Sequence, residues 1–481
     1  MLKIKKLESL TANRNIWIVG GYIRDSLLGK ITKDIDFTTD GNTKKIVGEF
    51  ADKTNGSFVV LDDFNKTYRV VIDDEIYDFS KMQGKNISED LSRRDFTINA
   101  MALPLIPQGL PLVAAYPTGT SVGRRRRPLT DNIIDPFNGQ DDIKNKIVRC
   151  ISEKNFVEDP LRLLRAYRFA GQLNFSIEPK TEKFIKKYSR KIKNISNERI
   201  QNELFLMLAL TNSYNIIIKI YKAGLLKEIM PELVETLNTA RCYYPKMGLL
   251  GHSFDALKVL EEFYSTNFKN VFPKFSKRIS AHLEEKISKT TKRKTLLKLA
   301  ALLHDIGKPK SAKKIEGRLR FFEHEDRGCD IINIIGKRLK LSNNEIKYLK
   351  ILTLHHMRIG NLTSAEKLTD RAAWRFFRDL QDDAIDLIVL SVTDAYTYPK
   401  GKTRTLHKIM ANKLLNKFYR QKEKIVPKKL LNGFEIMKIL KIPEGPVVGK
   451  ILEELEEAQV LKKIKTKNEA EKFIKHIYKN K

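Results

Sequence analysis

Asp34 and Asp36, separated by one apolar residue, are the two side chains of this sequence best suited to bind a metal ion. In an extended segment alternate side chains share a face, so both carboxylates would project together while Ile35 turns away. Two carboxylates on one face are typical of a Mg²⁺ site. A second metal ion needs a third carboxylate. Asp78 is the candidate, although an aspartate at a strand end is often a simple turn former.

A glycine turn lies shortly before these carboxylates. Residues 16–19 are apolar and predict a buried strand, and residues 22–28 predict the opening of a helix. Between them, Gly20 and Gly21 would let the backbone approach a ligand closely, and the amides of a helix start favour phosphate. A nucleoside triphosphate with its metal ion would fit between this turn and the two aspartates. Taken alone, a strand, a turn and two solvent-facing aspartates would give the same pattern.

A charged segment follows at Arg93-Arg94-Asp95, with Asn99 close behind it. These charged and amide groups could contact a triphosphate, a ribose or neighbouring loops. A surface with ordinary salt bridges would show the same residue types.

A fourth segment could read the base of a nucleotide. After Pro160, which fits a first helical turn, Asp159, Arg162 and Arg165 recur at helical spacing on one predicted face, and Arg168 follows one turn later. A carboxylate accepts from an exocyclic amine, and a guanidinium donates to a ring acceptor. Cytosine and adenine present an amine beside an acceptor, whereas guanine and uracil present the reverse order. An Asp–Arg pair could therefore select C and A, unless it is only a helix ion pair worth a few tenths of a kcal/mol.

Histidines and aspartates recur through the second half of the chain in segments with helical periodicity. They are His252, His304, Asp305, His324, His355, His356 and Asp394. Imidazoles and carboxylates from separate helices can converge in a bundle core and bind a metal ion. Two adjacent histidines cannot both point to one place on a helix, so we expect either His355 or His356 to lie outside such a site. A lone histidine on such a helix is more often an ordinary core or surface residue.

Composition limits the class of protein and of partner. The chain has 481 residues, 42% hydrophobic and 31% charged, which is typical of several globular domains. A net charge of +32 and a pI near 9.8 indicate a large anionic partner such as RNA or DNA, although a Lys-rich proteome would also raise the charge. Three dispersed cysteines support neither a disulfide framework nor a Cys-rich zinc site. No signal peptide or membrane span is predicted, so we expect a cytoplasmic protein.

The elements that must position these residues change type along the chain. Between residues 16 and 79 short apolar strands alternate with one or two helices, and Asp73 and Asp74 occupy the turn of a predicted β-hairpin. From residue 157 onward the apolar residues follow helical spacing. The expected fold class is therefore α+β, with an α/β head followed by mostly helical parts.

Two segments stand out by composition. Residues 104–130 are rich in Pro and Gly and carry four consecutive arginines near their end, which predicts a surface insertion whose arginines either contact phosphates or stay solvated. The Lys-rich residues 461–481 predict an amphipathic helix with a basic face.

Five stretches of the first half resemble the class II tRNA nucleotidyltransferases, which comprise CCA-adding enzymes, their CC-adding and A-adding relatives and bacterial poly(A) polymerases. In chain order they are VGGYIRD with DID, EDLSRRDFTINAMA, IIDPFNGQDDI, EDPLRLLRAYRFA and ISNERIQNELFLML. They keep the family order over residues 14–210. Around HDIGKP the second half resembles the HD phosphohydrolase domain, over residues 248–400.

The resemblance implies a nucleotidyltransferase head at residues 1–150, a helical neck that binds the base and RNA at 151–235, an α-helical HD domain at 236–420 and a basic helical tail at 421–481. The insertion at 104–130 departs from the short connection that is usual in the family.

The resemblance also assigns roles to residues. Asp34 and Asp36 would hold two Mg²⁺ ions. The nucleotide-binding residues would be Gly20, Gly21, Arg24, Arg94, Asp159, Arg162, Arg165 and Arg168. Structural supports would be Asn99, Asp135, Glu198, Arg199 and Glu203. The metal ligands of the HD domain would be His252, His304, Asp305 and Asp394, and a second metal or phosphate position would use His324, His355 and His356.

The expected activity is transfer of C, or of C and A, from CTP and ATP to the 3′ end of tRNA without a nucleic-acid template. The HD site would use Mg²⁺ or a divalent transition metal such as Mn²⁺, Ni²⁺ or Fe to hydrolyse phosphoesters. The alternatives are a poly(A) polymerase, an HD phosphohydrolase with an RNA-binding head, and a non-catalytic RNA-binding protein. The sequence gives no indication of the oligomeric state.

The path from Asp78 to Asp95 bears on which nucleotides are added. Family members that complete CCA have a flexible loop here, which helps to refit the pocket from C to A. In this chain the path is short, and a short loop has less reach to move a side chain against the pocket. The sequence therefore favours CC addition over full CCA addition.

Overall fold

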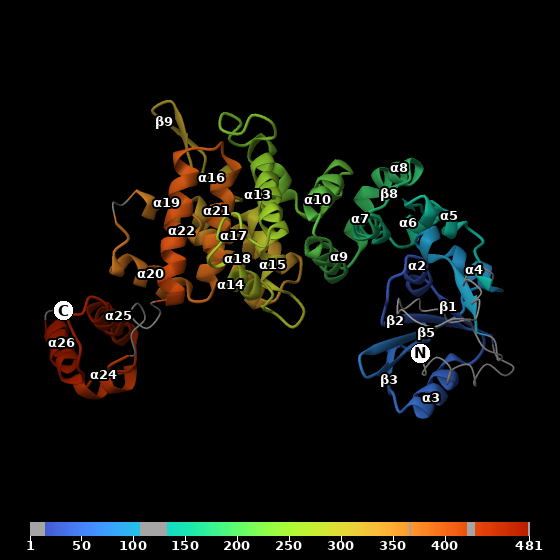
Figure 1. The fold of residues 1–481 in the computed structure, drawn as a ribbon, viewed down its shortest axis with the longest axis horizontal. Helices are drawn as coiled ribbons and strands as arrows, with labels where there is room; N and C mark the ends of the chain where they lie inside the picture. The colour runs from blue at the N-terminus through green and yellow to red at the C-terminus, as the bar shows by residue number, and fades with distance from the viewer. Residues whose placement is uncertain (1–14, 106–131, 365–366, 421–428, 480–481) are drawn as a thin grey trace, which may run out of the picture. The chain divides into compact units, whose positions relative to one another are not determined.

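The structure is a computed structural model that describes residues 15–105, 132–364, 367–420 and 429–479 (Figure 1). Nearly all of the predicted insertion, and the first fourteen residues, lie outside the described residues. The chain divides into two compact units, each of which is described by itself. The first is Met1–Glu203 with Lys219–Ile229, and the second is Leu204–Ile218 with Met230–Lys481. The finer division into head, neck, HD domain and tail stays a prediction.

The first unit is built on a six-stranded sheet of order β3-β4-β5-β2-β1-β6. Its strands are β1 (Ile16–Val19), β2 (Asp34–Thr39), β3 (Ser57–Asp62), β4 (Thr67–Ile72), β5 (Glu75–Lys81) and β6 (Ala102–Pro104). Only β2 and β5 pair in parallel within the described sheet, and this register sets Asp36 beside Asp78. The predicted β4–β5 hairpin is confirmed, and Asp73 and Asp74 form its turn.

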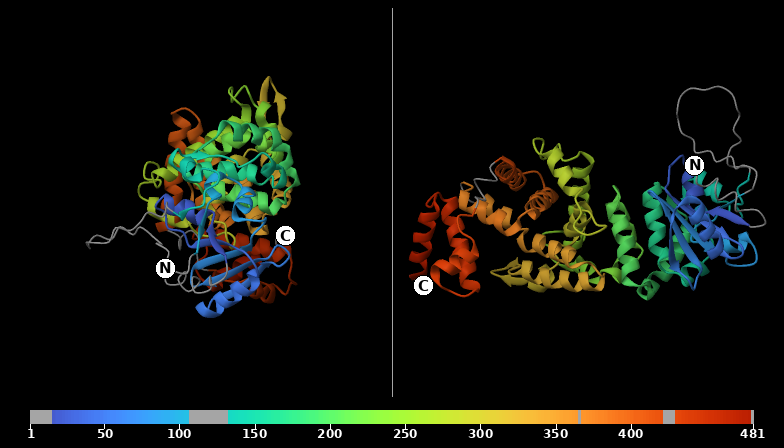
Figure 2. Two further views of the ribbon diagram at one scale, coloured as in Figure 1. Left: turned by 90° about the vertical axis from the view of Figure 1, so that its right-hand side faces the viewer. Right: turned by 90° about the horizontal axis from the view of Figure 1, so that it is seen from below.

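The alternation predicted around the two aspartates is also confirmed. Ile35 and Phe37 are buried on one face of the sheet, where the Phe37 ring stacks on that of Phe79 with centroids 4.7 Å apart. Helix α3 (Thr43–Thr54) covers this face and adds Phe50 to the cluster; it is labelled in Figure 1 and is the lowest blue helix in the left view of Figure 2. The carboxylates of Asp34 and Asp36 consequently project from the other face.

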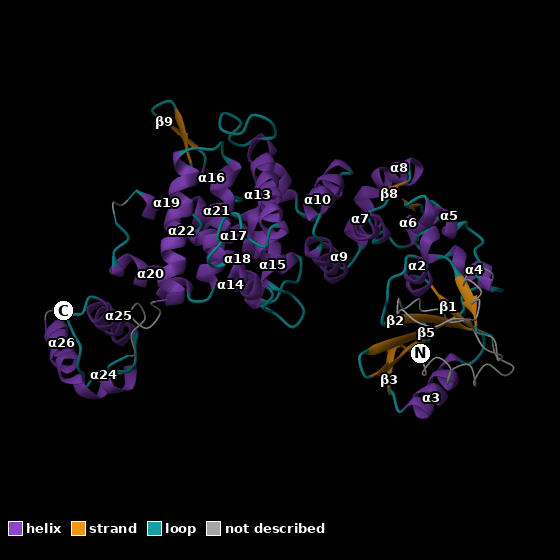
Figure 3. Cartoon of the chain, in the orientation of Figure 1, coloured by secondary structure: helices purple, strands orange, loops and turns teal. Residues whose placement is uncertain are grey.

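Short helices follow the strands in the first unit. They are α2 (Gly21–Leu27), α4 (Ile87–Ser92), α5 (Gly139–Lys144), α6 (Lys154–Glu158), α7 (Arg162–Leu173), α8 (Pro179–Tyr188) and α11 (Leu225–Ile229), and α9 (Asn197–Ala209) and α10 (Ser213–Lys222) each have residues in both units. The α+β class is confirmed, with strands concentrated in the N-terminal part (Figure 3).

The predicted helical face that begins at Asp159 is wrong at its first residue. Helix α6 ends at Glu158 and α7 begins at Arg162, and Asp159 between them is extended, with φ −136° and ψ 91°. The ring of Pro160 disfavours the helical conformation for the residue before it, which explains the break. Arg162, Arg165 and Arg168 remain on one helix, while Asp159 belongs to the connection that precedes it.

The second unit is helical except for a two-stranded sheet of β9 (Lys313–Ile315) and β10 (Arg318–Arg320). Its main helices are α13 (Gly248–Ser265), α14 (Ser276–Leu283), α15 (Arg293–Leu303), α17 (His324–Arg338), α18 (Asn343–His355), α20 (Asp370–Leu380), α21 (Asp383–Thr397) and α22 (Lys402–Arg420). Helix α21 is buried along most of its length and packs against α13, α15, α18 and α22. It therefore forms the axis of this bundle. No helix in the described part of the chain combines the length and the apolar character needed to cross a membrane.

The end of the chain is more than the single basic helix that the sequence suggests. Helices α24 (Gly433–Leu440), α25 (Pro446–Val460) and α26 (Lys467–Lys479) enclose an apolar core of their own, which includes Ile451 and Ile474. The lysines of α26 are the solvated side of this small bundle.

Candidate active site

One cavity in the first unit, of about 690 Å³, gathers nearly all the residues that the sequence singles out there. The predicted residues that line it are Gly20, Gly21, Arg24, Asp34, Asp36, Arg94, Asp159, Arg162, Arg165 and Arg168. They come from the ends of β1 and β2, from α2, from the segment after α4 and from the start of α7. Asp78 is the exception among the predicted metal- and nucleotide-binding residues of the head, since it does not line the cavity.

Asp34 and Asp36 of β2 line the cavity, whereas the carboxylate of Asp78 is paired with Arg69. Both oxygens of Asp78 accept hydrogen bonds from Arg69, at 2.7 Å each. Burial within the surrounding protein raises the pKa of Asp36. Arg94 opposes this shift, while the neighbouring carboxylates of Asp78 and Asp34 add to it. A bound divalent cation would relieve this repulsion, so the geometry suits a metal on Asp34 and Asp36 and gives no support to Asp78 as a third ligand.

Gly20 has a backbone conformation that a residue with a side chain rarely adopts, and it lies close to the side chains of Arg94 and Asp36. Its φ of 73° lies in the left-handed region, and a Cβ atom there would approach Arg94 to 3.1 Å and Asp36 to 3.5 Å. The glycine therefore lets the end of β1 pass directly beside the metal-binding carboxylates and the arginine.

A buried carboxylate, Asp95, organises the basic residues of the cavity. Its Oδ2 accepts two hydrogen bonds from Arg165, at 2.7 and 2.9 Å, and its Oδ1 accepts one from the Asn99 amide at 2.9 Å. Asn99 in turn accepts from Arg24 at 2.6 Å. Although burial alone would raise the pKa of Asp95, Arg165 and these hydrogen bonds hold it below its ordinary value. One ionised carboxylate thus positions an arginine of α7 and an arginine of α2.

The aromatic ring of Phe169 lies against three arginines of the cavity. The guanidinium carbons of Arg168, Arg24 and Arg165 lie 4.1, 5.1 and 5.2 Å from its centroid. Arg168 is also paired with Glu203 at 2.6 Å. Sequence reasoning missed Phe169, and its position directly after Arg168 in a helix rich in arginine was the available signal.

The two residues expected to read the base are held apart by different partners. Asp159 accepts a hydrogen bond from Arg199 at 2.9 Å, and Arg162 donates to the carbonyls of Asn155 and Arg93 at 3.1 and 2.7 Å. The structure contains no Asp159–Arg162 ion pair among the described residues. Both side chains line the cavity from fixed positions, and Arg199 orients the first of them.

In the second unit, two groups of side chains have the spacing of metal ligands. One is His252, His304 and Asp394, and the other is Asp305, His324 and His356. Asp305 joins them, because its Oδ2 lies 3.4 Å from the Nε2 atoms of His252 and His304, and its Oδ1 lies 3.2 Å from that of His356. His355 belongs to neither group.

The outer ring nitrogens of three of the four clustered histidines are fixed by carbonyl oxygens, whereas that of His252 lies 3.3 Å from the Thr397 hydroxyl. The Nδ1 atoms of His304, His324 and His356 lie 3.0, 2.8 and 2.7 Å from the carbonyl oxygens of the residues three positions earlier. This arrangement places the proton on Nδ1 and leaves Nε2 as a lone-pair donor. The Nε2 atoms of His252 and His304 face each other at 3.3 Å, as do those of His324 and His356 at 3.2 Å. Lone pairs that face each other suit a cation between them.

Two buried oxygens complete the fit to metal ions. Oδ1 of Asp305 and Oδ1 of Asp394 are buried and accept no hydrogen bond from the described residues. Such orphaned carboxylate oxygens are costly unless they bind a cation. Burial would raise the pKa of Asp305, but Lys308, 2.5 Å away, and His304 hold it well below its usual range. The donor set of nitrogens and carboxylates fits a divalent transition metal or Mg²⁺.

Three family models match the chain. They are described as poly A polymerase head domain (residues 16–149), probable RNA and SrmB- binding site of polymerase A (174–237) and HD domain (274–398). The HD match begins after His252, which the geometry nevertheless places among the ligand-like residues.

Similar proteins span almost the whole chain. The A-adding tRNA nucleotidyltransferase of Deinococcus radiodurans is 28% identical over 95% of this chain and 94% of its own. The CC-adding tRNA nucleotidyltransferase of Geobacter sulfurreducens is 26% identical over 95% and 91%. The solved structure of the Thermotoga maritima CCA-adding enzyme complexed with tRNA shares the fold, with a TM-score of 0.60 at 20% identity over 99% and 94% of the two chains.

We predict that Asp95→Asn destabilises the first unit by about 2 kcal/mol or more, because it removes the charge that pairs with Arg165. The folded-state pKa of Asp95 is depressed, so its contribution is present above about pH 4, the unfolded value, and is lost as the pH falls further. Urea unfolding at pH 7 and pH 3, followed by Trp17 fluorescence in a Trp374→Phe background, measures both effects.

The control is Asp141→Asn, which removes an exposed pair with Lys144 and should change the free energy of unfolding by less than about 1 kcal/mol. Equal effects of the two substitutions at pH 7 would contradict the role given to Asp95.

Proposed function

Because the chain belongs to the family of class II tRNA nucleotidyltransferases and poly(A) polymerases, with an HD domain in its second half, we propose that it adds C, or C and A, from CTP and ATP to the 3′ end of tRNA. The observation that carries the proposal is the composition of the head cavity. A pair of open carboxylates, a cluster of positioned arginines and a fixed Asp159 and Arg162 line the same hollow. These are the groups needed to bind a metal nucleotide and to select its base.

In this proposal Asp34 and Asp36 hold the divalent metal, for which Mg²⁺ suits oxygen ligands best. Divalent metal bound there would lower the pKa of an attacking 3′-hydroxyl and would stabilise the charge of a departing pyrophosphate. Arg24, Arg94 and Arg165 bind and orient the triphosphate. Their fixed positions matter because phosphoryl transfer depends mainly on positioning and on stabilisation of charge.

Base selection would come from Asp159 and Arg162. Arg199 holds the carboxylate of Asp159, and backbone carbonyls hold the guanidinium of Arg162, so the spacing between an acceptor and a donor is set before a nucleotide arrives. This preset order matches the Watson–Crick edges of C and A and opposes those of G and U. The protein itself would thus replace a nucleic-acid template.

The connection between β5 and α4 supports CC addition. Only residues 82–86 separate the two elements. The backbone N–H of Gln83 donates to the Asp90 carboxylate at 2.8 Å, and the backbone N–H of Lys85 donates to the Glu89 carboxylate at 2.8 Å. Side chains of α4 therefore hold the connection in place. A short segment that is held by hydrogen bonds has little freedom to move and reshape the pocket for ATP. We therefore propose that this chain adds the two C residues. Similarity to A-adding and CC-adding relatives does not separate the two activities, since the identities are 28% and 26%.

A second activity, phosphoester hydrolysis in the second unit, is proposed from the two converging groups of histidines and aspartates. A divalent metal held there would supply a bound water as nucleophile and would polarise a phosphoryl oxygen. Lys308, beside Asp305, lies where it can bind a phosphate oxygen.

We predict that Asp36→Ala reduces nucleotide addition at least 10³-fold, on the order expected when a metal ligand is lost, while tRNA binding changes little. Steady-state incorporation of labelled CTP and filter binding of tRNA measure the two properties. Asp52→Ala, which removes an exposed carboxylate of α3, is the control and should be neutral. Near-normal turnover of the Asp36 variant would refute the metal assignment.

We predict that Arg162→Ala relaxes base choice, since Asp159 alone cannot fix the order of donor and acceptor. The ratio of kcat/KM for CTP to that for UTP should fall by about 10-fold or more, as expected for one lost polar contact. Arg190→Ala, on the surface of the same unit and outside the cavity, provides the comparison. Unchanged discrimination in the Arg162 variant would remove its template role.

For the second unit we predict that His304→Ala in the full chain lowers both metal content and phosphoesterase activity to near background. Metal content is measured by mass spectrometry after exposure to Mn²⁺, Ni²⁺, Fe²⁺ or Mg²⁺, and activity is measured with a 2′,3′-cyclic nucleotide. His355→Ala is the matched control, because this neighbouring histidine lies outside both groups. If the wild-type chain binds none of these ions and shows no phosphoesterase activity with any of them, the proposed hydrolysis is refuted and the second unit has only a structural role.

A further inference from the structure

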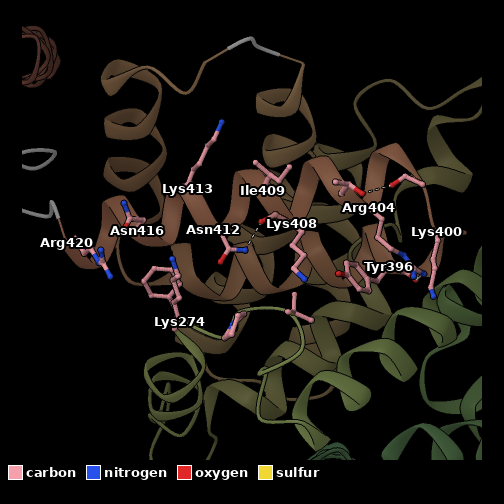
Figure 4. Close-up of a pocket in the computed structure, with 15 residues that line it drawn as sticks. Lys274, Tyr396, Lys400, Arg404, Lys408, Ile409, Asn412, Lys413, Asn416 and Arg420 are labelled. Carbon is pink, nitrogen blue, oxygen red and sulfur yellow. Dashed lines mark hydrogen bonds between the residues drawn. The ribbon is translucent and has the colours of Figure 1, made fainter.

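The helical unit has a large hollow along α22 that has no part in either proposed reaction. Its volume is about 870 Å³. Figure 4 shows its side chains spread along the helix, from Lys400 and Arg404 at one end to Asn416 and Arg420 at the other, with Lys274 on the facing loop. We call this hollow the α22 groove.

The walls of the α22 groove carry one sign of charge. The basic residues that line it are Lys274, Lys400, Arg404, Lys408, Lys413 and Arg420. Among the described residues that line it, none is acidic. A concave surface with only positive charge concentrates the field of those charges and attracts a polyanion.

The cations are spread along the length of the helix. Arg404, Lys408, Asn412 and Asn416 recur at intervals of four residues, and Lys413 lines the hollow from further around the helix. The stretch from Arg404 to Arg420 spans about 24 Å at the rise of an α-helix. Cations spread over this length match a linear ligand with repeated negative charges better than they match a single phosphate.

Part of the lining of the groove is apolar. It includes Val271, Pro273, Tyr396 and Ile409, and Ile409 keeps 47% of its surface exposed. A single RNA strand combines a charged backbone with apolar base faces, and a basic groove with apolar or aromatic surface suits both parts. A duplex hides its base faces and would leave these apolar side chains uncovered.

One end of the α22 groove meets the hollow over the metal-ligand groups. Gly401 lines both hollows, and the second of them includes Asp305, His356 and Asp394. Arg404 fixes this junction, since it donates to the carbonyls of Tyr396 and Tyr398 at 2.5 and 2.7 Å and its guanidinium lies 4.5 Å from the Tyr396 ring centroid. A strand in the groove would therefore direct one end toward the histidines.

We propose that the α22 groove binds the backbone of single-stranded RNA and leads one end of the strand to the metal-ligand groups of the HD domain. The surface is separate from the cavity of the head, and binding there requires neither nucleotide addition nor hydrolysis. Its test is therefore independent of both proposed activities.

The test uses the full chain and the triple variant Lys274→Gln/Lys400→Gln/Lys413→Gln. All three lysines are exposed and form no ion pair with a described residue, so their replacement should leave the fold intact. The probe is a fluorescein-labelled single-stranded oligoribonucleotide, whose affinity is measured by anisotropy over a range of salt concentrations. The slope of log K against log salt should become shallower by about 2, since each lost phosphate contact on a single strand accounts for roughly 0.7.

The matched control is Lys258→Gln/Lys337→Gln/Lys347→Gln, which removes the same charge from exposed helix positions of the same unit outside both hollows. Its slope should stay at the wild-type value. A 4-thiouridine strand should also cross-link to the wild-type segment of residues 396–420. The proposal is overturned by equal slopes for the two triple variants. It is also overturned by a larger loss with duplex than with single-stranded RNA, or by occupation of the groove by poly-glutamate in place of RNA.

Discussion

The ion pair between the buried carboxylate of Asp95 and the partly exposed guanidinium of Arg165 is the constraint on which the head site depends. Asp95 lies in the segment that returns from α4 toward the sheet, and Arg165 lies on α7, so one carboxylate ties the sheet part of the unit to its helical part. The same carboxylate orients Asn99, which holds Arg24. A buried carboxylate is costly unless it is paired and fully hydrogen-bonded, and here it accepts from a guanidinium, a side-chain amide and a backbone amide. The arginines of the cavity are therefore in place before any phosphate is bound.

The two sites of the chain are suited to ligands of opposite charge. In the head, positive side chains are held near each other by Asp95, by Glu203 and by the Phe169 ring, which leaves a hollow ready for an anion. In the HD domain, carboxylates and imidazole lone pairs converge, which leaves a position ready for a cation. In each site the like groups would repel one another without a ligand, and hydrogen bonds to neighbouring carbonyl and carboxylate oxygens keep them in place.

Much of this could be predicted from the sequence where a local rule applies. Alternation on a strand placed Asp34 and Asp36 on one face, and the hairpin before Asp78 followed from its turn residues. The rule for residues before proline was available and would have removed Asp159 from the helix. Long-range pairing was not available. No local sequence pattern indicates that Arg69 pairs with Asp78 or that the ring of Phe169 contacts three guanidiniums. Nor does one indicate that His356, and not His355, lies beside Asp305. The separate core of the last three helices was likewise not predicted, although apolar residues recur over residues 430–461, because a local pattern does not show which helices pack together.

Base-selective addition to a tRNA end is the central claim, and the products themselves test it most directly. The tRNA transcripts that end just before the CCA sequence would be incubated with the wild-type protein, with each nucleoside triphosphate alone and with all four together, and their 3′ ends sequenced. We expect two C residues to be added whenever CTP is present, no addition from UTP or GTP, and no further growth when ATP is included. Ends that remain unextended under every condition, or that carry long runs of A, would contradict the account.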